Sequence, residues 1–98
     1  MAARQSHTLT VLKALADGTR MEILTLLGTR RYCVGALAAR LGITQGAVSQ
    51  HLRIMKAAGL LTAERCGYYM HYRVSAAALT RLAEAMRSLV KPKAAEGR

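Results

Sequence analysis

The sequence predicts a mainly helical domain with one small β-hairpin. Apolar residues recur at helical spacing in about five segments, and the period changes to two after Gly59, around a turn at Gly67 and Tyr68. A chain of 98 residues with 52% hydrophobic content can bury one modest core, which we expect to span residues 1–90. The core should be aliphatic, because the chain has four Tyr and no Trp or Phe. The basic stretch 91–98 is expected to be a disordered tail.

Two helices are expected before residue 30. The first should run from the region of residues 6–8 to the Ala-Asp-Gly break at 16–18. Asp17 can cap a second, more apolar helix that ends at Gly28. The TRRYCV segment that follows is β-prone over too few residues for more than a short strand.

The middle of the chain predicts a helix-turn-helix. A short helix over residues 35–41 should end at Gly42, and Thr44 can cap a second helix over about 45–58. Two short helices joined by about three residues through a glycine form this motif. In the second helix one apolar stripe is expected to face inward, formed by Val48, Leu52 and Met55.

The C-terminal part predicts a β-hairpin, or wing, over about 61–74, followed by a last helix capped by Ser75. That helix carries a long apolar stripe: Leu79, Leu82, Ala83, Met86, Leu89 and Val90. A terminal helix on so small a domain covers only part of the core. A homodimer through the first and last helices would bury the remainder, and internal packing alone is the alternative.

Charge points to a polyanionic partner. Fifteen Lys and Arg against five Asp and Glu give a formal charge of +10, and no acidic residue occurs from Gly28 through Ala63. Such a field attracts nucleic acid, although a protein can also simply be basic. No apolar run is long enough for a membrane span or resembles the centre of a signal peptide, so we expect a cytoplasmic protein. We do not expect an enzyme, because no His and acid stand beside either cysteine in the manner a nucleophile requires.

The second helix of the motif is predicted to read double-stranded DNA in the major groove. Its outward side chains are small or polar and suit base edges and phosphates: Gln45, Gly46, Ser49, Gln50 and Arg53. His51 could donate to a phosphate or be a partly buried polar residue at the edge of the core. On the wing we expect Arg65 and Tyr68 to contact the adjacent groove, and Tyr69 and Tyr72 to pack. A non-specific or architectural nucleic-acid-binding protein without an inducer is the alternative.

Three linked segments resemble the ArsR-type (ArsR/SmtB) family of winged-helix repressors over roughly residues 9–90. ALADGTRMEILTLL is similar to the family's LADPTRLRILxLL, with Gly18 in place of the usual proline. YCVGALAARLGITQGAVSQHLRIMKAAGLL matches its helix-turn-helix, and ERCGYYMHYRVS its wing. The resemblance implies a homodimeric winged helix-turn-helix repressor that leaves an inverted-repeat operator when an inducer, often a metal or metalloid ion, binds. By position, it places Gln45, Ser49, Gln50 and His51 in the recognition motif and Arg65 on the wing, whereas Tyr68 stands where many relatives have Arg or Lys.

The candidate sensor residues are Cys33 and Cys66. Members that bind thiophilic ions before the recognition helix use a CVCxxC-like cluster, of which only Cys33 is present, and 75–90 contains Glu84 but no His or Asp for the alternative site on the last helix. No complete metal site is visible. Cys33 could be a packing residue, a sensor of oxidant or reactive sulfur, or a metal ligand together with His7 or the other subunit. We expect it near the base of the hairpin, about 16 Å from the level of Cys66, so an intramolecular disulfide would require rearrangement of the fold.

Overall fold

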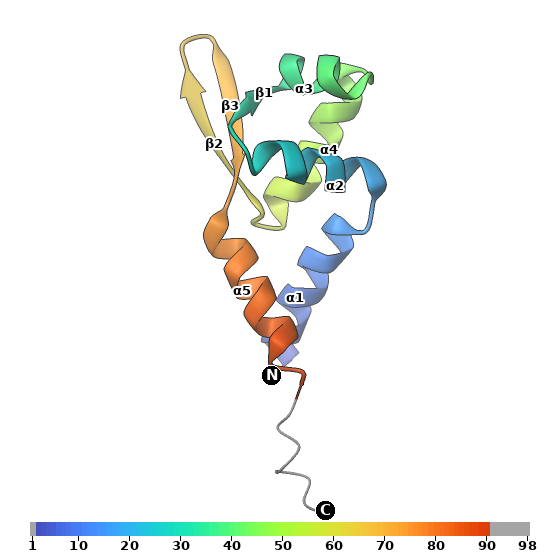
Figure 1. Ribbon diagram of the computed structural model, residues 1–98, viewed down its shortest axis with the longest axis vertical. Coiled ribbons are helices and arrows are strands. Elements are labelled where there is room, and N and C mark those ends of the chain that lie inside the picture. The colour runs from blue at the N-terminus through green and yellow to red at the C-terminus, as the bar shows by residue number, and fades with distance from the viewer. Residues whose placement is uncertain (1, 91–98) are drawn as a thin grey trace, which may run out of the picture.

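The computed structural model describes the backbone of residues 2–90 and the side chains from Ser6 onward, so the predicted tail at 91–98 lies outside the described residues. Within residues 2–90, five helices and three short strands follow one another (Figure 1). Their bounds are α1 Ala2–Leu15, α2 Gly18–Leu27, β1 Tyr32–Cys33, α3 Val34–Leu41, α4 Gln45–Ala57, β2 Leu61–Cys66, β3 Tyr69–Val74 and α5 Ala76–Arg87. The mainly helical fold with a small wing is therefore confirmed.

The first two helices meet at a tight junction capped by Asp17. Helix α1 begins at Ala2, so the predicted start in the region of residues 6–8 was wrong. Ala and Arg are among the strongest helix formers, and the AAR segment extends the helix without an apolar pattern of its own. At the junction, Asp17 Oδ2 accepts a hydrogen bond from the Arg20 backbone N–H at 3.0 Å. This bond satisfies one of the N–H groups that the first turn of α2 leaves without a helical partner.

The helix-turn-helix forms as predicted from α3 and α4. Gly42 ends α3 in the left-handed conformation (φ 69°), and its N–H donates to the Ala38 carbonyl at 2.9 Å. The Thr44 hydroxyl then accepts from the Ala47 N–H at 3.1 Å and caps α4. Glycine at the turn and a hydroxyl cap together allow only three residues to connect α3 with α4.

The wing is part of a three-stranded antiparallel sheet in the order β1-β3-β2. The sequence predicted the two long strands and a stub at TRRYCV, and this stub pairs as an edge strand, with Cys33 opposite His71. On the other side of β3, Glu64 also pairs with His71, and Cys66 pairs with Tyr69 across the turn. Gly67 in that turn has φ 66°, a conformation that suits glycine.

One aliphatic core joins α1–α4 and the base of the wing. Its most deeply buried side chains come from α2, α3, α4 and the α4–β2 connection: Ile23, Leu37, Val48, Met55 and Leu60. No polar or charged residue is fully buried in the part of the chain that the structure describes. Helices α1 and α5 lie side by side at the end of the molecule opposite the wing tip (Figure 1). Between residues 2 and 90, no helix combines the length and apolarity that crossing a bilayer requires.

Candidate nucleic-acid interface

Helix α4 separates an apolar side from a polar side. Val48 and Met55 are fully inaccessible and Leu52 is 2% exposed, which confirms the inward stripe. Replacing one of these aliphatic side chains by alanine typically costs about 2–5 kcal/mol of folding free energy. The stripe therefore fixes the rotation of α4 about its axis, and with it the direction in which the polar side faces.

The predicted reading residues lie on the polar side of α4. Gln45, Gly46, Gln50 and Arg53 are exposed, and Ser49 is half-buried. Arg53 Nη1 donates to Gln50 Oε1 at 2.9 Å, so these two side chains form a pair on the surface. A Cβ added at Gly46 would meet only Thr44 Oγ1, at 3.9 Å, which is ordinary van der Waals contact. No neighbouring atom of the protein therefore prevents a larger residue at this surface position.

A groove of about 330 Å³ lies between α4 and the wing. Ser49, Arg53 and Lys56 line one side, and Tyr72 on β3 lines the other. Neither Lys56 nor Tyr72 was predicted from the sequence to be a site residue. Lys56 could have been found, because it lies three residues after Arg53 and seven after Ser49 on the same helical side. The position of Tyr72 follows from the packing of β3 against α4, which local spacing does not predict.

His51 contacts the junction between α1 and α2. Its Nδ1 lies 3.2 Å from Arg20 Nη1 and 4.0 Å from Asp17 Oδ2, and its side chain is 21% exposed. His51 was predicted to be either a phosphate donor or a partly buried polar residue at the edge of the core. These contacts match the second role. Its other ring nitrogen, Nε2, has no hydrogen-bond partner among the side chains described and is not buried. Hydrogen bonding to the Arg20 backbone N–H, with the charge of the Arg20 guanidinium, holds the pKa of Asp17 below its ordinary value despite an opposing effect of desolvation.

The two wing residues predicted to contact DNA lie at or near the tip of the hairpin. Arg65 is exposed near the turn, and Tyr68 in the turn is 96% exposed. Successive strand residues alternate between the faces of a sheet, so Arg65 shares its face with Ala63 and hence with Tyr72, which lines the groove. The packing role predicted for Tyr69 is wrong, because 64% of this residue is exposed.

Two cations of the acid-free interval contact neighbouring side chains of the protein. The Arg30 guanidinium lies over the Tyr32 ring at 4.7 Å from its centroid. Arg31 Nη1 lies 3.5 Å from Glu64, the first acidic residue after the interval, in an exposed ion pair. The remaining cations of the interval, Arg40, Arg53 and Lys56, are exposed on α3 and α4. Within this interval, the positive charge that no neighbouring acid or aromatic ring contacts therefore lies on the helix-turn-helix.

Both candidate sensor cysteines are free and half-buried. The expected position of Cys33 near the hairpin base was wrong, because β1 pairs with the middle of β3 and places Cys33 level with His71 and Glu64. Cys66 lies two residues farther along β2 than Glu64, which is level with Cys33. Cys33 and Cys66 are therefore separated by about 7 Å along the strand direction. They are also separated by about 10 Å across the sheet, because β3 lies between their strands. That offset still exceeds the reach of a disulfide. His71 Nδ1 is buried without a hydrogen-bond partner among the described residues.

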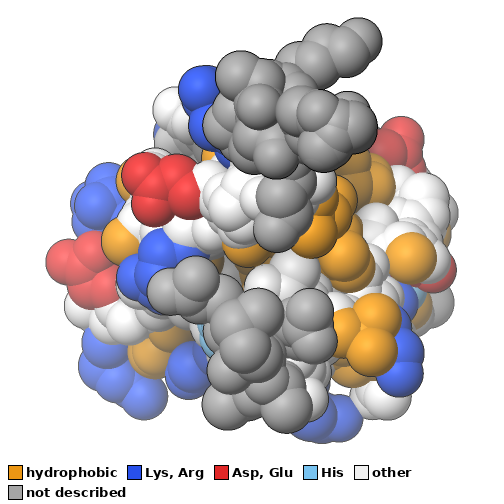
Figure 2. All heavy atoms as spheres, turned by 90° about the horizontal axis from the view of Figure 1, so that it is seen from below, with side chains coloured by type: hydrophobic (Ala, Val, Ile, Leu, Met, Phe, Trp, Pro, Cys, Tyr) orange, Lys and Arg blue, Asp and Glu red, His pale blue; other side chains and the backbone are white. Residues whose placement is uncertain are grey.

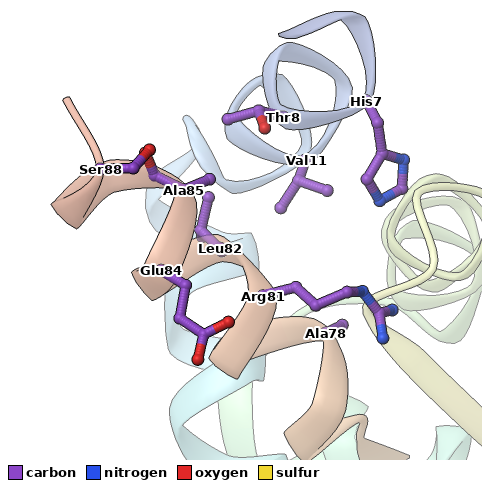
Figure 3. A pocket seen from close by; sticks show the side chains of 9 residues that line it. All are labelled: His7, Thr8, Val11, Ala78, Arg81, Leu82, Glu84, Ala85 and Ser88. Carbon is purple, nitrogen blue, oxygen red and sulfur yellow. The ribbon is translucent and has the colours of Figure 1, made fainter. Parts of the chain in front are cut away.

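His7 does not approach Cys33 but lines a pocket of about 480 Å³ between α1 and α5. Figure 3 shows Val11 of α1 and Leu82 of α5 directed into the space between the two helices. Hydrophobic side chains are visible on this end of the molecule (Figure 2). Five large ones that α1, α5 and the residues just after α5 expose are Leu9, Leu12, Met86, Leu89 and Val90. Within residues 2–90, no three His, Cys, Asp or Glu side chains lie close enough together to hold a metal ion.

The motif and its flanks match a known family. Residues 17–63 fit the family described as "Bacterial regulatory protein, arsR family". The regulator YbzH of Bacillus subtilis is 32% identical over 93 residues, an alignment that spans 80% of this chain and 93% of YbzH. The chain belongs to the ArsR family. This family consists of transcriptional regulators and not of enzymes.

Other relatives differ in length and described activity. The "HTH-type transcriptional repressor SmtB" of Mycobacterium tuberculosis is 43% identical over 65 residues, which are 66% of this chain and only 48% of SmtB. The "Transcriptional activator HlyU" of Vibrio cholerae is 29% identical over 91% of this chain and 82% of its own length. An ArsR-like regulator from Rhodococcus sp. RHA1 superposes with a TM-score of 0.82 at 33% identity, covering 87% of this chain and 80% of that one. A Mycobacterium bovis domain described as a homodimeric winged helix-turn-helix DNA-binding domain gives 0.77 at 33% identity, covering 90% and 82%.

Proposed function

We propose that the protein is a homodimeric, sequence-specific repressor that binds double-stranded DNA in the cytoplasm. The observation that carries this proposal is the polar side of α4. Its side chains are small or polar and include no carboxylate. The buried stripe Val48, Leu52 and Met55 keeps this side of the helix directed outward. A helix with this surface can enter a major groove without electrostatic repulsion from phosphates.

Base reading is assigned to α4. Gln45 and Gln50 can each pair with adenine through two hydrogen bonds, and Arg53 can read guanine or bind a phosphate. Ser49 and His51 are assigned to base or phosphate contacts at the edges of this surface. Arg65 and Tyr68 extend the contact along the wing to the adjacent groove. Lys56, in the groove beside Arg53, is added as a phosphate contact.

Dimerisation is assigned to α1 and α5. The hydrophobic side chains that these helices expose at one end of the molecule would be buried by a second copy of the chain. The homodimeric domain from Mycobacterium bovis supports this assignment. Two copies would place two α4 helices on half-sites about one turn of DNA apart.

Repression is the proposed outcome, although one relative, SmtB, is described as a repressor and another, HlyU, as an activator. A dimer that lies across two half-sites excludes RNA polymerase wherever its operator overlaps a promoter. Release is assigned to an inducer that acts at Cys33 or Cys66. A peroxide, for example, would convert either thiol to a sulfenic acid with loss of water or alcohol. A metal or metalloid ion bound between subunits is the other form of inducer.

The test of DNA reading is selection from a random duplex pool followed by footprinting. The proposal predicts an imperfect inverted repeat with half-sites about one turn apart and an affinity that falls steeply with salt. Exchange of Gln45 and Ser49 for alanine should relax the base preference. Equal protection of random and palindromic DNA would instead support the non-specific alternative that a net charge of +10 favours.

The test of release is a titration of the protein–DNA complex with arsenite, zinc, cadmium, peroxide and polysulfide. Wild type, Cys33→Ser and Cys66→Ser are compared. A thiol sensor predicts that one agent releases wild type and not one of the two variants. If no agent changes DNA binding, the inducer assignments fail together.

A further inference from the structure

Arg20 connects three elements at one point below the recognition helix. Its Nε donates to the Ala14 carbonyl in the last turn of α1 at 2.5 Å, and its backbone N–H donates to Asp17 at the start of α2. Its Nη1 lies 3.2 Å from Nδ1 of His51 on α4. The side chain is partly buried, and each of these contacts has hydrogen-bonding distance.

The contact between Arg20 and His51 determines which nitrogen of the ring carries the proton. A guanidinium has only donors and stays charged, so the Nδ1 atom that faces it must accept the hydrogen bond. An imidazole that accepts at Nδ1 is neutral and carries its hydrogen on Nε2. The Asp17 carboxylate at 4.0 Å from Nδ1 would favour the opposite arrangement, but the guanidinium is nearer.

The remaining nitrogen of the ring is available to a ligand. Nε2 has no hydrogen-bond partner among the side chains described and keeps contact with solvent. His51 lies about 100° around α4 from Gln50, between the exposed surface of the helix and the buried stripe. A fixed N–H donor beside the recognition surface suits a phosphate oxygen of the DNA backbone, because the phosphates flank the groove.

We propose that Arg20 is a positioning residue for DNA binding, which holds the His51 ring so that Nε2–H is donated to a DNA phosphate. Arg20 itself does not contact DNA in this arrangement. The inference rests on the proposed function, since it requires α4 to bind DNA. It also links α1, one of the two helices assigned to the dimer, to the orientation of a side chain on the recognition helix.

Two substitutions of His51 distinguish the roles of its two ring nitrogens. Asparagine places an amide where Nδ1 stands, one bond from Cγ, whereas glutamine places an amide N–H where Nε2 stands. We expect His51→Gln to bind a fluorescent duplex, selected by the wild-type protein from a random pool, within about threefold of wild type, because it keeps the phosphate donor. We expect His51→Asn to bind about tenfold more weakly, the usual effect of one lost hydrogen bond to a charged group. The reverse order would overturn the proposal, since it would assign the role of His51 to the internal contact alone.

The link to Arg20 is tested by a double-mutant cycle on the same duplex. Arg20→Met should weaken binding about tenfold in wild type and by less than about twofold in His51→Gln, where no ring remains to be positioned. Arg31→Met is the matched control, because Arg31 pairs with Glu64 on the wing, and its effect should be the same in both backgrounds. Equal effects of Arg20→Met in both backgrounds would overturn the proposal.

A loss of folding is distinguished from a loss of DNA binding by separate measurements. Circular dichroism and thermal unfolding report whether each variant folds, and Arg20→Lys replaces Arg20→Met if the latter does not. Lysine keeps the charge but, with one ammonium group, cannot reach Ala14 and His51 with the same geometry. If wild type itself selects no duplex, the proposed function fails; if wild type binds and the cycle shows no coupling, only the role of Arg20 fails.

Discussion

The two ends of the molecule differ in surface chemistry. The helix-turn-helix end is polar and cationic, and residues 28–63 contain no carboxylate. The end formed by α1 and α5 instead exposes large aliphatic side chains, and a pocket of about 480 Å³ lies between these two helices (Figures 2 and 3). A surface without acidic groups suits a polyanion, and an exposed apolar surface suits a second protein surface. The two ends are therefore assigned different partners, DNA and a second copy of the chain.

Charge placed at the apolar end should have the largest effect. Met86→Glu puts a carboxylate on the exposed α5 surface, so the dimer should dissociate and affinity for a two-half-site duplex should fall by about a hundredfold. Sedimentation and DNA titration measure the two quantities. Met21→Glu on α2 is the matched control, because Met21 is 46% exposed and Met86 is 41% exposed. A Met86→Glu variant that stays dimeric would contradict the assignment of the dimer interface to the apolar end.

A carboxylate at the polar end should have the next largest effect. Gln50→Glu preserves size and can still accept from Arg53, so the fold should be unchanged. The new charge would lie against phosphates, and affinity should fall by about ten- to a hundredfold in a titration at 0.1 M salt. Thr25→Glu on the exposed surface of α2 makes the same change in net charge and should have a small effect. Equal losses in both variants would mean that only total charge matters.

Bulk added at Gly46 tests how closely α4 approaches DNA. Gly46→Ala meets no obstacle inside the protein, so folding stability should rise by up to about 1 kcal/mol. DNA affinity should nevertheless fall by about three- to tenfold, because the methyl group enters the proposed contact. Gly18→Ala, in the first turn of α2 and likewise free of close neighbours, should gain stability without losing affinity. Unchanged DNA affinity in Gly46→Ala would place this position outside the contact.

The smallest expected effect is the acid dependence of folding stability at Asp17. Hydrogen bonding to the Arg20 N–H lowers the pKa of Asp17 below 3.8, so its charged form stabilises the folded state above about that pH. This contribution should be lost as pH falls from 3.8 through the lower folded-state pKa. Urea unfolding of wild type and Asp17→Asn from pH 7 to pH 2 measures it. Wild type should lose its advantage over the variant only in the acid range, and a constant difference at every pH would contradict this cause.

Local patterns predicted the elements, whereas contacts between distant segments were predicted poorly. Caps and glycines gave α2, α3, α4 and α5 because hydrogen bonds at a helix end depend on a few adjacent residues. The stripe of α4 was also correct, since helical period determines it. The contact of His51 with Arg20 and the level of Cys33 beside His71 were missed, because each joins segments more than thirty residues apart. The exposure of Tyr69 was missed for a related reason, since strand alternation does not show where the covering core ends.

The most direct test of the difference between the two ends is a chemical-shift map of the isotopically labelled protein with its selected duplex. We expect the backbone amides of residues 45–53 and 65–69 to shift most, and those of α1 and α5 to shift least. Resonances of Leu9, Leu12 and Met86 should instead change on dilution of the free protein, as the dimer dissociates. Large DNA-induced shifts confined to α1 and α5, with residues 45–53 unaffected, would contradict the account.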